Sequence, residues 1–101
     1  MEVKKSLLSK NILESTTVNK KLKDEYVSMI NRLEYNKTIM EQLYRNMNYQ
    51  LLYNQLYDNI IYLLKQKKYF ERILKDELLN EMNILIDSHV KTYSYYMNKL
   101  N

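Results

Sequence analysis

The chain has 101 residues and contains neither glycine nor proline. An average chain of this length would hold about seven glycines and about five prolines. Tight β-hairpins, glycine-rich phosphate loops and dinucleotide-binding turns need backbone at positive φ or turns fixed by proline. Folds built on such turns are therefore not expected. Hydrophobic residues make up 46% and charged residues 28% of the chain. This balance is typical of a globular protein, and the length suits a single domain over 1–101.

Apolar side chains recur at helical spacing along most of the sequence. From Leu22 to Met47 they alternate steps of four and three, which is the repeat of a coiled-coil seam, with Asn36 as its polar member. A second stripe runs from Leu78 to Leu100 with a mean step of about 3.67 residues, an eleven-residue rhythm. These patterns predict an all-α protein of long amphipathic helices, arranged as a coiled coil, a helical hairpin or a bundle.

Helix boundaries have few sequence signals here. Serine and threonine within 14–19 are suited to cap a helix, and so is Ser88. The lysine-rich stretch 65–68 suits a solvated turn and a charged helical rung equally well. We expect a short N-terminal helix over 2–13, a long helical region over 18–86 and a C-terminal helix over 88–100.

The segment Met40–Leu64 is unusually apolar, since 15 of its 25 residues are apolar or tyrosine. A dimeric coiled coil needs about two apolar residues in seven. A helix that is apolar over more of its circumference is buried on more than one side. Either the chain folds back on itself or partner helices enclose this segment, and the sequence leaves both arrangements open. In either case Leu56 and Ile60 are expected in an essential helix–helix contact.

The function that these patterns favour is non-enzymatic assembly with partner helices, as a scaffold component or subunit of a larger complex. The partner is expected to be a protein that binds through helix faces, in a homo-oligomer or a hetero-oligomer. The predicted interface follows the apolar positions of the central and C-terminal segments: Met40, Leu43, Met47, Leu52, Tyr53, Leu56, Tyr57, Ile60, Leu63, Leu78, Met82 and Leu85.

Tyrosine is the commonest aromatic residue, with eleven copies against one phenylalanine. Tyrosine combines apolar area with a polar tip and is frequent at protein interfaces. It also replaces leucine or phenylalanine at the edge of a core. Both interpretations remain open at this point.

Catalytic and metal-binding chemistry has little support. The chain has no cysteine and one histidine, His89. Ser–His and Cys–His arrangements and two-histidine metal sites are therefore incomplete or impossible within one chain. His89 lies on the C-terminal apolar stripe, which favours a seam residue over a catalytic one. We expect no catalytic residue, no metal ion, no cofactor and no small-molecule substrate.

Charge provides the alternative function. The net charge is +4, and the basic residues gather in the clusters 4–23 and 65–75. Such clusters attract nucleic acid or an anionic membrane surface. Arginine is scarce, however, and no known nucleic-acid-binding motif is visible, so this function ranks second to protein binding.

Targeting signals are absent from the sequence pattern. No apolar run approaches the roughly 20 residues of a transmembrane helix, and the first residues lack the apolar core of a secretory signal. We expect a cytoplasmic or nuclear protein that is not secreted.

Overall fold

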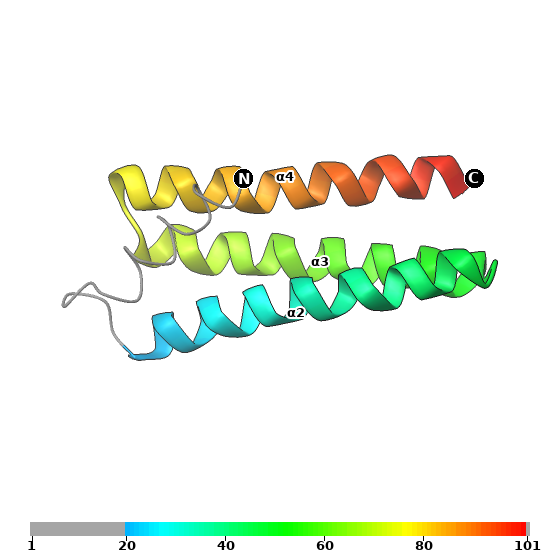
Figure 1. Cartoon of the computed structure of the whole chain (residues 1–101). Coiled ribbons are helices and arrows are strands. Elements are labelled where there is room, and N and C mark those ends of the chain that lie inside the picture. The colour runs from blue at the N-terminus through cyan, green and yellow to red at the C-terminus, as the bar shows by residue number, and fades with distance from the viewer. Residues whose placement is uncertain (1–19, 101) are drawn as a thin grey trace.

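The computed structural model describes residues 20–100, so the helix expected over 2–13 and the boundary expected in 14–19 lie outside the described residues. The described chain forms three helices joined by two short turns: α2 (Lys20–Arg45), α3 (Tyr49–Ile73) and α4 (Asp76–Leu100) (Figure 1). No strand occurs between residues 20 and 100. The all-α prediction is confirmed. The chain folds back on itself as a bundle, which resolves the choice between a rod and a folded chain.

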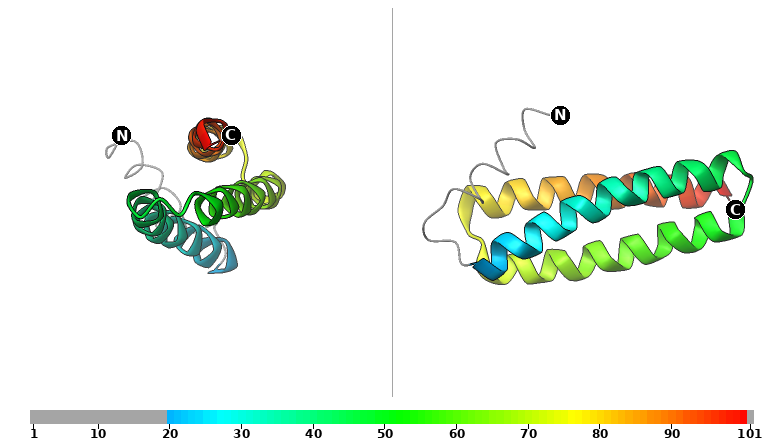
Figure 2. Two further views of the ribbon diagram at one scale, coloured as in Figure 1. Left: turned by 90° about the vertical axis from the view of Figure 1, so that its right-hand side faces the viewer. Right: turned by 60° about the horizontal axis from the view of Figure 1, so that its bottom comes forward.

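The helices run alternately up, down and up, and α3 contacts both of the others. It packs more extensively against α4 than against α2. Viewed end-on, the three helices occupy the corners of a triangle (Figure 2). The bundle measures 46 × 23 × 20 Å between Cα atoms, so its long axis is about the length of one helix.

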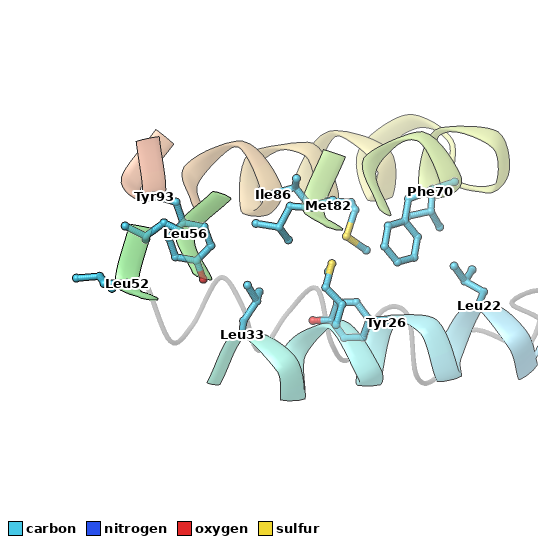
Figure 3. Packing of buried hydrophobic residues seen from close by; sticks show 12 residues of the cluster. Leu22, Tyr26, Leu33, Leu52, Leu56, Phe70, Met82, Ile86 and Tyr93 are labelled. Atoms are coloured by element: carbon cyan, nitrogen blue, oxygen red, sulfur yellow. The ribbon is translucent and has the colours of Figure 1, made fainter. Parts of the chain in front are cut away.

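The core is a single cluster between the three helices. In α2 the buried residues follow the predicted steps of four and three, from Leu22 and Tyr26 to Asn36. In α3 the same alternation continues from Leu52 to Phe70. The close-up in Figure 3 shows Leu22, Tyr26 and Leu33 of α2 pointing toward Phe70, Met82 and Ile86 of the other two helices. Burying a large apolar side chain stabilises a fold by about 1.5–3 kcal/mol. The buried apolar residues are Leu22, Tyr26, Met29, Leu33, Leu52, Leu56, Leu63, Phe70, Leu74, Met82, Ile86 and Tyr93.

Two expected boundaries differ from the observed ones. The region 18–86 is interrupted by turns at 46–48 and 74–75, and α4 runs without a break through Ser88. Ser88 does not cap a helix; its carbonyl accepts a hydrogen bond from the Thr92 hydroxyl inside α4, at 3.0 Å. Core packing on both sides of this point keeps the backbone helical, because tertiary contacts outweigh a local capping preference. The lysine-rich stretch 65–68 is helical as well.

The turn between α2 and α3 is a helix-terminating motif that usually contains glycine. Met47 has φ of 59°. The Asn48 amide donates to the Leu43 carbonyl at 2.9 Å, and the Met47 amide donates to the Tyr44 carbonyl at 3.1 Å. These two bonds define a Schellman motif, whose left-handed residue is normally glycine. Met47 was expected in the apolar seam, but in this turn its side chain is 73% exposed.

Replacing Met47 with glycine should stabilise the bundle. The left-handed conformation costs a non-glycine residue about 1–2 kcal/mol, and the exposed side chain contributes little packing. Glycine also raises the conformational entropy of the unfolded chain, which offsets part of this stabilisation. The net increase in unfolding free energy should be up to about 1 kcal/mol. Urea unfolding measures the difference. The neighbouring Asn48→Gly variant is the control. Asn48 has φ of −83°, so glycine should lower the unfolding free energy at this position. Equal changes in unfolding free energy at both positions would contradict backbone strain at Met47.

Candidate functional site

Most of the predicted interface residues pack inside the chain itself. Leu52, Leu56, Leu63 and Met82 are buried in the core. Leu56 lies in the core and Ile60 packs partly buried against it, so both residues face other helices of this chain. Tyr53 is half-buried, whereas Met47 and Tyr57 are exposed. The remaining members are partly buried against the core: Met40, Leu43, Ile60, Leu78 and Leu85.

Two polar contacts interrupt the apolar packing between α2 and α3. The Asn36 side-chain amide donates to the Asn59 side-chain carbonyl at 2.6 Å, and both residues are buried. The Asn59 amide in turn lies 3.8 Å from the Met40 sulfur. Both asparagines occupy positions of the four–three repeat, where a buried asparagine pair specifies the register of neighbouring helices. A slip of one heptad in either direction would place the Asn59 amide against an apolar residue of α2, Met29 or Leu43, with no hydrogen-bond partner.

The second polar contact lies farther from the turn. The Gln66 amide donates to a Glu25 carboxylate oxygen and to the Tyr62 hydroxyl, each at 3.2 Å. The Arg32 guanidinium lies 3.9 Å from the centre of the Tyr62 ring, a cation–π contact. Burial raises the pKa of Tyr62, against the opposing effects of the Gln66 hydrogen bond and the Arg32 charge. Glu25 and Arg32 belong to α2, so these contacts join α3 to α2 at a second position along the helices, besides the asparagine pair.

The opposite face of α3 carries an exposed repeat with the same spacing, here called the outward seam: Asn54, Tyr57, Ile61, Leu64 and Lys68. Its three central residues are apolar and stand 52%, 37% and 43% exposed, respectively. At 3.6 residues per turn, these positions lie side by side on one surface of the helix. α3 therefore has an apolar face turned inward and another turned to solvent.

Charged side chains border the outward seam. Asp58 and Lys65 are exposed, seven residues apart, and so lie on the same edge of the helix. On the other edge, the Lys67 ammonium forms an ion pair with the Asp87 carboxylate of α4 at 2.8 Å. The seam is thus an apolar strip with an acid and a base along one border.

The two basic clusters meet at one end of the bundle, as far as they are described. The start of α2 (Lys20, Lys21 and Lys23) and the basic segment 65–75 lie at the end that also holds the α3–α4 turn (Figure 1). Acidic residues share this end, among them Glu71, Asp76 and Glu77. The charge there is mixed, with a basic excess.

His89 lies within α4 as a partly buried residue. Its Nδ1 atom is 2.9 Å from the Leu85 carbonyl oxygen, and its ring meets the Tyr93 ring edge-on with 6.1 Å between the ring centres. Among residues 20–100, no group of three or more His, Asp or Glu side chains is placed to hold a metal ion. In the same range, no helix has the length and apolar composition to cross a membrane.

Comparison with protein-family models, with curated proteins and with solved structures finds no match to this chain.

The interface predicted from the sequence includes Tyr57 of the outward seam but neither Ile61 nor Leu64. The available signal was the second four–three repeat, which runs from Asn54 to Lys68. The buried repeat beside it, from Leu52 to Phe70, has Asn59 and Gln66 as members. Apolar spacing alone favours Ile60 over Asn59 as the member of this repeat, because Asn59 is polar.

The buried asparagine pair should show strong coupling. Asn59→Leu leaves the Asn36 amide buried without its partner, so we expect a loss of about 1–3 kcal/mol in unfolding free energy. The double variant Asn36→Leu/Asn59→Leu removes both polar groups and should recover most of that loss. Urea unfolding of both single variants and the double variant measures the coupling. Additive losses in the double variant would contradict the predicted pairing.

Stability should fall at alkaline pH, and Tyr93 should contribute to the fall. Burial raises the pKa of its phenol above the ordinary value near 10, against an opposing effect of Arg32. The stabilisation is fully present below the unfolded pKa and is lost as pH rises through the folded one, because only the unfolded chain ionises freely there. Thermal unfolding from about pH 9 to about pH 11 measures this decline. Tyr93→Phe should reduce the decline without removing it, because burial also raises the pKa of Tyr62, whereas the exposed Tyr95→Phe should keep the wild-type decline.

Proposed function

We propose that this chain is a non-enzymatic protein-interaction module that binds a partner helix through the outward seam of α3, as a subunit of a larger assembly. The observation that carries the proposal is the exposed row Tyr57, Ile61 and Leu64. These residues stand at positions i, i+4 and i+7, which is the anchor spacing of helix-to-helix recognition. Single exposed apolar residues are common, but an ordered apolar row on one face marks an interaction surface.

The architecture of α3 supports the same function. Its inward face already supplies the packing that the bundle needs. The outward row therefore adds apolar surface that the fold does not use. Binding through it requires no opening of the core, since α2 and α4 contact other sides of α3 through Gln66 and Lys67.

Disrupting the outward seam should abolish partner binding without unfolding the bundle. Ile61→Asp with Leu64→Asp places two charges on the exposed face, where substitutions change stability by about 1 kcal/mol or less. The experiment compares proteins captured by the wild type and by this variant from the cells of origin, with circular dichroism as the check on folding. Lys37→Ala on α2 is the control and should keep every partner.

The alternative function is binding of a polyanion at the basic end of the bundle. It is favoured by the meeting of the clusters 20–23 and 65–75 at that end. Phosphate contacts weaken steeply with salt, whereas burial of apolar surface does not. The triple variant Lys20→Ala/Arg72→Ala/Lys75→Ala lies outside the outward seam. The polyanion function would replace helix binding if this triple variant lost its partner while the seam variant kept it. Binding by the seam variant would then also have to weaken with salt.

A further inference from the structure

Building on the function proposed for the outward seam, we propose that its partner is a second copy of this chain. Two α3 helices pack antiparallel, seam against seam, around a two-fold axis between Ile61 and Leu64. The inference goes beyond general helix binding, because it names the partner, the direction of the helices and their register.

The apolar residues of the seam are self-complementary in this register. In an antiparallel pair, each four–three position meets the other type of position across the interface. Ile61 then packs against Leu64 of the second copy, and the two-fold axis repeats the contact. One turn outward, the Tyr57 ring meets the Lys68 side chain of the second copy, an arrangement suited to a cation–π contact. The apolar centre and its flanks are thus filled by the seam's own residues.

The charges bordering the seam select the antiparallel direction. Asp58 and Lys65 are exposed on the same edge of α3, and they lie on opposite sides of the proposed axis along the helix. Antiparallel packing places Asp58 beside Lys65 of the second copy, and the axis produces the pair twice. Parallel packing would place this edge beside the opposite edge of the second copy, near Tyr53 and Ile60, and would not form the Asp58–Lys65 pairs. The edge charges therefore match a reversed copy of the same helix.

The other helices leave room for this contact. α2 reaches α3 through Asn59, Tyr62 and Gln66, and α4 reaches it through the Lys67–Asp87 ion pair. In the end-on view of the bundle, α2 and α4 both lie to one side of α3 (Figure 2). The outward seam faces away from both neighbours, so two bundles can meet there without rearrangement.

Sedimentation velocity across micromolar concentrations tests the proposal. The wild type should shift from monomer to dimer as its concentration rises. Ile61→Asp should weaken dimerisation at least about tenfold, since it places two carboxylates at an apolar centre. Asp58→Lys and Lys65→Asp should each weaken it as well, because each creates like charges across the axis. The control Glu34→Lys/Lys37→Asp, on the exposed face of α2, should dimerise as the wild type does.

The decisive step is a mixture of the two charge variants. Asp58→Lys carries two bases on the seam edge and Lys65→Asp carries two acids, so in antiparallel packing every charge of one meets an opposite charge of the other. Each variant alone should be mainly monomeric, and the equimolar mixture should form a heterodimer with near wild-type affinity.

Three outcomes would overturn the dimer. They are a wild type that stays monomeric throughout, a dimer that survives Ile61→Asp, and a mixture that fails to associate while each variant is folded by circular dichroism. A monomeric wild type whose captured partner is lost on Ile61→Asp would leave the proposed function standing and assign the seam to a different protein. If that capture were also unaffected, both proposals would fail together.

Discussion

The packing of one face of α3 against two helices at once is the interaction on which the bundle depends. Leu56, Leu63 and Phe70 on this face lie in one cluster with residues of both α2 and α4. α2 and α4 contact each other much less than either contacts α3. Polar members of the same face, Asn59 and Gln66, make the hydrogen bonds to α2. α3 thus supplies both the apolar burial and the polar specificity that bring the other helices into place.

Much of this arrangement follows from residue spacing. The steps of four and three in α2 predict its buried face from Leu22 to Asn36, because a helix buries residues on one side of its circumference. The ends of the helices were harder to predict. Met47 turns the chain in a conformation that glycine normally adopts, so no local preference of the sequence marks the turn. Ser88 is a good capping residue, yet packing on either side of it keeps α4 continuous.

The interaction surface shows where spacing stops being informative. The apolar density of Met40–Leu64 indicates a helix buried on more than one side, but it does not say which side the chain covers itself. That assignment depends on where α2 and α4 lie, and so on contacts such as Asn36–Asn59 that join distant residues. With those contacts in place, Leu56 belongs to the interior and Tyr57, its neighbour in sequence, belongs to the surface. Whether that surface recognises another protein stays a prediction.

The position of the Asn36–Asn59 hydrogen bond along the hairpin has a consequence for the folding pathway. This bond joins residues 23 apart in sequence, whereas the Glu25–Gln66 bond joins residues 41 apart. Closing the shorter loop costs less chain entropy, so a hairpin that zips from the turn reaches the asparagine pair first. A hairpin that starts in the wrong register meets an unsatisfied amide while few contacts have formed, and it can still separate quickly. The asparagine pair is therefore placed to reject a wrong register of α2 against α3 early in the formation of this hairpin.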